Sequence, residues 1–142
     1  MPVINARSVR ALLLCLLFVL AGCSTSPLKT LKPLPVPADV SSAQVASTIK
    51  QALSDRHYQV LEETPGHVKG RYTKESSSLT IDVAYNASGI VINYVDSQGL
   101  DYEQSDGSAR INKHYYRWIK LLRKTLRKEL RQVPDASDET EE

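Results

Sequence analysis

The sequence predicts an α+β fold, a four-stranded antiparallel β-meander with an N-terminal and a C-terminal helix packed on one face. Two segments, residues 41–56 and 110–133, place apolar side chains at helical spacing. Between them lie four short segments of alternating or apolar character, separated by turn residues. Short turns favour antiparallel neighbours, and the apolar face of such a sheet must be covered by other elements.

The first helix is expected from Ser41 to about Arg56. Ser41 and Gln44 have the spacing of a capping box, in which each side chain binds the backbone N–H of the other residue. One helical face carries the apolar residues Val45, Ile49, Ala52 and Leu53. This pattern predicts a helix that packs on the sheet through a single face.

The four strand-like segments are residues 58–62, 67–72, 78–85 and 90–95. The third alternates best, with Leu79, Ile81, Val83 and Tyr85 on one face. Pro65 and Gly66 mark the first turn, and the sequence Asn86–Gly89 marks a hairpin. Residues 97–109, which contain two glycines and three acidic residues, are predicted to form a loop.

The C-terminal helix has the strongest amphipathic pattern in the chain. Its apolar stripe is formed by Ile111, Tyr115, Trp118, Leu122, Leu126 and Val133. Its opposite arc carries the basic residues Lys113, Arg117, Lys120, Arg123, Lys124, Arg127 and Arg131. Pro134 ends the helix, and the acidic tail 134–142 is expected to be disordered.

The N-terminus has the features of an export signal. Arg7 and Arg10 precede a ten-residue apolar run, which as a helix rises only about 15 Å, half of a hydrocarbon core. The run therefore predicts a signal peptide over residues 1–22 and not a membrane span. It ends in Leu20-Ala21-Gly22-Cys23, which resembles the lipobox of bacterial lipoproteins.

This resemblance implies cleavage before Cys23, a diacylglyceryl group on its thiol and acylation of its new amino group. Ser24 follows the cysteine, and by resemblance to enterobacterial lipoproteins it favours the outer membrane over the inner one. We therefore expect a lipid-anchored protein on the periplasmic face of the outer membrane. Residues 23–40, with four prolines after the lipidated cysteine, are predicted to be a free tether with a reach of roughly 50 Å.

Composition excludes several classes of function. Without the two leader arginines the chain has 16 basic and 16 acidic residues, so it is not a strongly basic nucleic-acid binder. Cys15 leaves with the leader and Cys23 carries lipid, which leaves no thiol for a disulfide, a metal or catalysis. The three histidines lack metal-ligand spacing, and no catalytic motif occurs. We expect a non-enzymatic domain, residues 41–133, without metal or cofactor.

Two surfaces are candidates for binding. Residues 110–131 contain nine basic residues and one acidic residue. Their polar arc could be a solvated face that the acidic tail partly neutralises, could dock on an acidic protein or a second copy, or could contact anionic lipid headgroups. Alternatively, the strand tyrosines Tyr72, Tyr85 and Tyr94 could form a platform on an open sheet face. The first surface predicts an adaptor domain, and the second predicts a module that binds small ligands, cell wall or lipid.

The chain also resembles a family of small Gram-negative lipoprotein domains with no established activity. The resemblance covers about residues 45–130 and is carried by the segments 81–85, 92–94, 97–100 with Tyr102, and 111–118. The family has Ile-His where this chain has Ile111-Asn112, and Tyr-Asn where it has Tyr115-Tyr116. It implies the same fold and a lipid anchor, but no reaction.

Overall fold

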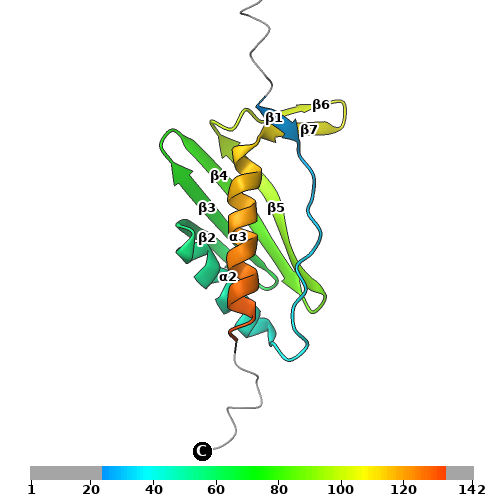
Figure 1. The fold of residues 1–142 in the computed structure, drawn as a ribbon, viewed down its shortest axis with the longest axis vertical. Helices are drawn as coiled ribbons and strands as arrows, with labels where there is room; N and C mark the ends of the chain where they lie inside the picture. Colours follow the sequence, from blue (N-terminus) through cyan, green and yellow to red (C-terminus); the bar gives the residue numbers. More distant parts are fainter. Residues whose placement is uncertain (1–23, 134–142) are drawn as a thin grey trace, which may run out of the picture.

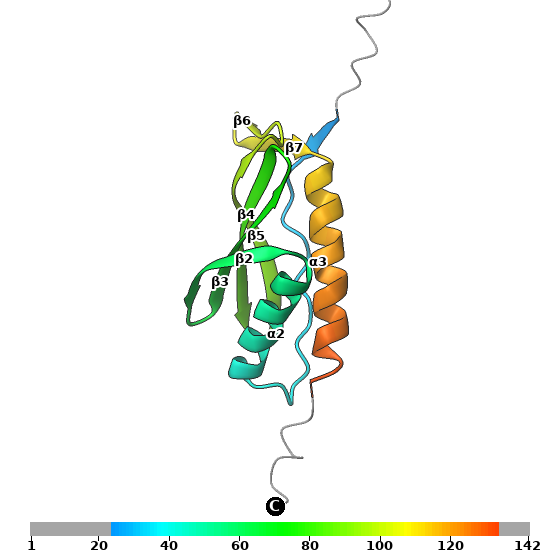
Figure 2. The same ribbon diagram turned by 90° about the vertical axis from the view of Figure 1, so that its left-hand side faces the viewer.

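Two helices lie against one face of a four-stranded antiparallel sheet, as Figures 1 and 2 show. The computed structural model describes residues 24–133 of the chain. Its elements are β1 (Thr25–Pro27), α2 (Ser42–Asp55), β2 (Tyr58–Thr64), β3 (His67–Lys74), β4 (Ser77–Asn86), β5 (Gly89–Gln98), β6 (Glu103–Ser105), β7 (Ser108–Asn112) and α3 (His114–Leu130). The main sheet has the order β2-β3-β4-β5, so the predicted α+β meander is confirmed.

The alternation of β4 sets the face of the sheet that the helices cover. Leu79, Ile81 and Val83 are fully buried and belong to the same core cluster as the apolar residues of both helices. The helix residues of that cluster include Ile49, Leu53, Leu122 and Leu126. Because successive side chains of a strand point to opposite faces, Asp82 and Ala84 lie on the other side of the sheet, which no helix covers.

The start of α2 follows the predicted cap. The hydroxyl of Ser41 accepts a hydrogen bond from the backbone N–H of Gln44 at 3.2 Å. The Gln44 side-chain oxygen in turn accepts from the backbone N–H of Ser41 at 2.8 Å. The box satisfies two N–H groups that a helix start would otherwise leave unpaired.

The prediction of a loop over residues 97–109 is wrong in its second half. The strands β6 and β7 form a hairpin there, with Asp106 and Gly107 at its tip. Both tip residues have positive φ, 48° and 76°, and Asp-Gly is a favoured pair for a two-residue hairpin turn. The helix α3 consequently begins at His114 and not at Arg110, and Ile111 is buried as a strand residue of β7.

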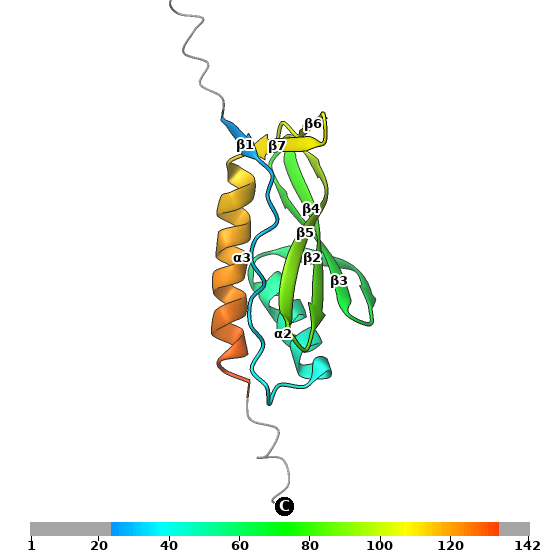
Figure 3. The ribbon, with the colours of Figure 1, turned by 90° about the vertical axis from the view of Figure 1, so that its right-hand side faces the viewer.

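The prediction of a free tether over residues 24–40 is also wrong. β1 pairs antiparallel with β7, with Thr25 opposite Asn112, and the pairing continues where the backbone N–H of Leu28 donates to Ala109 O at 2.8 Å. Figure 3 shows the segment running from β1 along α3 and beside β5. We call residues 24–36 the N-terminal strap.

Apolar side chains explain why the strap is docked. Leu34 is 1% exposed, and it exchanges two backbone hydrogen bonds of 2.8 Å with Ile90 of β5. Leu28, Leu31 and Val36 pack against the same core. The prolines keep the strap extended and oppose a helix, but these four aliphatic residues give it a surface to bury.

Several sequence-based predictions concern residues outside the described range. The signal peptide, the lipidation of Cys23 and the acidic tail 134–142 are among them. Within residues 24–133, no helix is long and apolar enough to cross a membrane.

Candidate functional site

The basic residues predicted for the C-terminal helix gather on the exposed side of α3. Six of the seven are exposed, and we call them the basic face: Lys113, Arg117, Lys120, Lys124, Arg127 and Arg131. Their separations alternate between four and three residues, which places them on one side of a helix. From first to last the stripe is about 27 Å long. The prediction of a one-sided basic arc is therefore correct for these six.

Arg123 is the exception among the predicted residues. Its guanidinium is half-buried and donates a hydrogen bond to the backbone oxygen of Lys32 in the strap at 2.9 Å. Burial, with a further contribution from the nearby charge of Arg127, lowers the pKa of Arg123. Arg123 thus fastens the strap to α3, and it is not part of the basic face.

The charges of the basic face are not neutralised by described carboxylates. Over residues 24–133 no ion pair involves any of the six side chains, and the one ion pair on α3 joins Lys128 to Glu129 at 3.5 Å. Elsewhere, Lys50 pairs with Glu63 at 3.1 Å, and Lys69 pairs with Glu62 at 2.7 Å. Like charges three or four residues apart repel along a helix. The basic face therefore reduces the stability of the domain, as a surface kept for a partner would.

Replacing Lys124 with glutamine is expected to stabilise the protein. Lys120, Arg127 and Lys128 lie three or four residues from it, and each like-charged pair costs about 0.2–0.5 kcal/mol. Glutamine and lysine have similar helix propensities. Lys124→Gln should raise the free energy of unfolding by about 1 kcal/mol, measured by urea denaturation at low salt.

The control for this measurement is Lys74→Gln, which removes an exposed base from the end of β3. It should change stability by less than about 0.5 kcal/mol. In about 1 M salt the gain from Lys124→Gln should disappear, because charge repulsion is then screened. A loss of stability in Lys124→Gln would mean that the basic face is not self-repelling.

The C-terminal half of the basic face borders a hollow of about 460 Å³. It is lined by Arg56, Lys124, Thr125, Arg127, Lys128, Arg131 and Gln132, which include five basic residues and no carboxylate. Arg56, at the C-cap of α2, donates from Nε to the Thr125 hydroxyl at 2.7 Å. No local sequence pattern points to Arg56, because its partner Thr125 lies 69 residues further along the chain.

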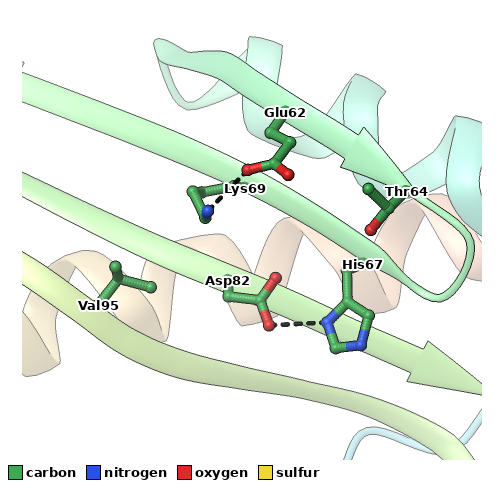
Figure 4. Close-up of a pocket in the computed structure, with 6 residues that line it drawn as sticks. All are labelled: Glu62, Thr64, His67, Lys69, Asp82 and Val95. Carbon is green, nitrogen blue, oxygen red and sulfur yellow. Dashed lines mark hydrogen bonds and ion pairs between the residues drawn. The ribbon is translucent and has the colours of Figure 1, made fainter.

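The open face of the sheet carries a second hollow, of about 370 Å³, which Figure 4 shows. It contains the ion pair of Lys69 with Glu62 at 2.7 Å and a hydrogen bond between His67 Nδ1 and the Asp82 carboxylate at 2.9 Å. The hydrogen bond to Lys69 lowers the pKa of Glu62. Unlike the bases of the basic face, Lys69 on this surface has a carboxylate partner.

The His67–Asp82 pair has the geometry of an oriented histidine, and among residues 24–133 no hydroxyl group is hydrogen-bonded to its ring. Thr64 lines the same hollow, and within residues 24–133 no hydrogen bond joins its hydroxyl to the His67 ring. The adjacent Glu62 and Glu63 point to opposite faces, as their strand positions predict, because Glu63 binds Lys50 of α2 and Glu62 binds Lys69. The open face thus offers no converging acid–base pair at these residues.

The predicted tyrosine platform is wrong. Tyr72 pairs across the sheet with the buried Leu79, and Tyr94 with the buried Ile81, so both lie on the helix-covered face. Tyr85 continues the same face of β4, and all three tyrosines pack against the core. Cross-strand partners share a face, so the register that buries these neighbours also turns the tyrosines inward.

Aromatic side chains of the sheet instead pack against α3 and form a cluster between the sheet and this helix. Trp118, predicted as core, is only partly buried and meets Tyr72 edge-on, with ring centroids 4.8 Å apart. Tyr58 stacks behind Tyr72 at 5.2 Å, and its buried hydroxyl has no hydrogen-bond partner among the described residues. Burial raises the pKa of Tyr58, and it raises the pKa of Tyr115 to about 12.

Tyr58→Phe is expected to raise the free energy of unfolding by about 1 kcal/mol, because it removes a buried hydroxyl that makes no hydrogen bond. Tyr94→Phe is the matched control. Its hydroxyl is 2.9 Å from the Ser97 hydroxyl, so the same substitution should lower stability by about 1 kcal/mol. Chemical denaturation of both variants tests this, and a destabilised Tyr58→Phe would contradict it.

Comparison with family models, curated proteins and solved structures finds no match to this chain. The resemblance to small Gram-negative lipoprotein domains thus stays a prediction. Within residues 24–133, no group of three histidine, cysteine, aspartate or glutamate side chains is arranged to hold a metal ion.

Proposed function

We propose that this protein is a lipoprotein anchored through Cys23 to the periplasmic face of the outer membrane. In this proposal it is a non-enzymatic adaptor domain that binds an acidic envelope protein through the basic face. The observation that carries the proposal is the stripe of six exposed bases, none of them ion-paired within residues 24–133. An acidic partner would supply the missing countercharges.

The shape of the surface supports a protein partner over lipid headgroups. The stripe borders a hollow of about 460 Å³, and a protruding acidic segment can enter a hollow. A flat layer of headgroups would touch the exposed ridge of α3 and leave the hollow empty. Within residues 24–133 no carboxylate is ion-paired with the six bases, and an acidic partner would relieve the repulsion among them.

The docked strap supports a position close to the membrane. The Ser24 backbone oxygen accepts a hydrogen bond from the Lys113 N–H at 3.0 Å, at the start of α3. A lipid on Cys23 would therefore be one residue from the folded domain, and not at the end of a tether reaching roughly 50 Å. The partner would then be another component held at or near the same membrane.

In-cell photocrosslinking tests the proposal. A photoreactive amino acid at Lys120 or Lys124 of the full-length protein is expected to give a discrete adduct with an acidic envelope protein. The same probe at Val95, which is 45% exposed on the open face of the sheet, is the control and should not give that adduct. Adducts with lipid alone, or no adduct at either position, would contradict the proposed partner.

A further inference from the structure

We infer that Arg56 is the anchoring residue of the partner site, held by Thr125 to grip a carboxylate of an acidic protein segment. This inference rests on the proposed function and adds the position and the chemistry of the contact. Four observations carry it. The side chain of Arg56 is fixed, and its terminal nitrogens make no described hydrogen bond. Thr125, which fixes it, has no other evident role, and the charged residues around Arg56 in the hollow are all basic.

The side chain of Arg56 is held across two helices. The backbone N–H of Arg56 caps α2, with hydrogen bonds of 3.2 Å to the backbone oxygens of Ala52 and Leu53. The half-buried side chain then crosses to α3, where Nε donates to the Thr125 hydroxyl at 2.7 Å. A guanidinium oriented in this way loses less conformational entropy on binding than a free arginine.

The terminal nitrogens of Arg56 are left for a ligand. A guanidinium has five N–H donors, and the hydrogen bond to Thr125 uses the one on Nε. Within residues 24–133, no ion pair or other side-chain hydrogen bond involves Arg56. The two terminal nitrogens form the fork that binds the two oxygens of a carboxylate.

Thr125 makes sense as a positioning residue. It lies on the buried arc of α3 between Leu122 and Leu126, where an apolar side chain would pack, and it is only 6% exposed. A buried hydroxyl has a cost unless it is hydrogen-bonded, and its partner here is Arg56. The polar residue in this apolar arc is thus explained by the arginine that it holds.

The surroundings suit several carboxylates and not just one. Lys124, Arg127, Lys128 and Arg131 line the hollow together with Arg56, and no acidic residue does. The hollow of about 460 Å³ can admit more than one acidic side chain. A segment with consecutive acidic residues supplies both the carboxylate for the fork and the neighbouring negative charges for the lysines.

The test measures binding of a fluorescent hexaglutamate peptide to the full mature chain in neutral detergent, by fluorescence anisotropy at low salt. Arg56→Lys keeps the charge but loses the fork, and it should weaken binding about tenfold. Thr125→Val keeps the shape and releases Arg56, and it should weaken binding about fivefold. The matched control is Arg71→Lys, because Arg71 also donates from Nε to a threonine hydroxyl, that of Thr80 at 3.1 Å, but lies on β3 outside the hollow and outside the basic face. It should change affinity less than about twofold.

Wild-type affinity in Arg56→Lys, or an equal loss in Arg71→Lys, would overturn the inference in favour of diffuse charge attraction. Displacement of the peptide by pyrophosphate at a lower concentration than by unlabelled hexaglutamate would overturn the carboxylate assignment. Thermal unfolding of each variant shows whether it is folded, and Thr125→Val carries the test if Arg56→Lys is not.

The photocrosslinking experiment separates this inference from the proposed function. If a protein adduct forms at Lys124 but Arg56→Lys binds the peptide like wild type, the adaptor proposal stands and the inference fails. If peptide binding depends on Arg56 but no protein adduct forms in cells, the site stands and the partner is of another kind.

Discussion

Reversing two charges at the centre of the basic face, Lys120→Glu with Lys124→Glu, is expected to weaken partner binding about 100-fold. The double variant changes the local charge by four units. Each unit close to an acidic partner is worth up to about 1 kcal/mol in water, and a 100-fold loss corresponds to about 2.7 kcal/mol. The fold should be retained, because both side chains are exposed and make no described ion pair.

The measurement is the affinity of the purified full-length protein for the partner that photocrosslinking identifies, with circular dichroism as the check on folding. Lys69→Glu with Arg71→Glu is the control, since both bases lie on the open face of β3, which is turned away from α3, and the change in net charge is identical. An equal loss in the control would assign the effect to net charge. An unchanged affinity in the test variant would place the partner on another face.

Shortening the buried side chain of the strap, Leu34→Ala, is expected to cost about 3 kcal/mol of unfolding free energy. Leu34 is 1% exposed, and buried leucine-to-alanine changes typically cost about 2–5 kcal/mol. The contact is close, because a Cβ at Gly89 would lie 2.6 Å from the Leu34 backbone oxygen. The loss of the side chain should also loosen the strap, so limited proteolysis should cut residues 24–36 faster.

Urea denaturation measures the loss, and Leu61→Ala provides the control. Leu61 is the same residue type but is 44% exposed on β2, and its substitution should cost less than about 0.5 kcal/mol. If Leu34→Ala and Leu61→Ala cost the same, the strap contributes nothing to the core. Rapid cleavage of the strap in the unmutated protein would contradict its docking.

Sequence periodicity could predict the elements that need only an apolar layer on one side and water on the other. The alternation of Leu79, Ile81 and Val83 needs only an apolar layer on one side, and the helices supply it. The basic face follows from the 3.6-residue period in the same way. The helical period could not show that Arg123 differs from the residues of the basic face. The burial of Arg123 depends on the strap, which lies beside it in the fold.

The remaining features depend on contacts between distant segments. The docking of the strap, the Arg56–Thr125 hydrogen bond and the inward register of Tyr72 each join residues that no local pattern relates. One missed feature did have a local signal. The dipeptide Asp106-Gly107 is typical of a two-residue hairpin turn, and it predicts the turn between β6 and β7. The loop predicted over residues 97–109 did not include this hairpin.

The pairing of β1 with β7 sets the order in which the molecule can be completed. The first described strand needs a partner that is made more than 80 residues later, so β1 must wait for almost the whole chain, although Leu34 of the strap can pair with Ile90 earlier. Contacts between such distant segments are slow to form, because a large loop must close before they contribute. We therefore expect β1, the first part of the strap, to dock in the last folding step. Until β7 and α3 are made, the residues beside Cys23 have nothing to bind, so a chain truncated before residue 108 should leave this segment open to proteases.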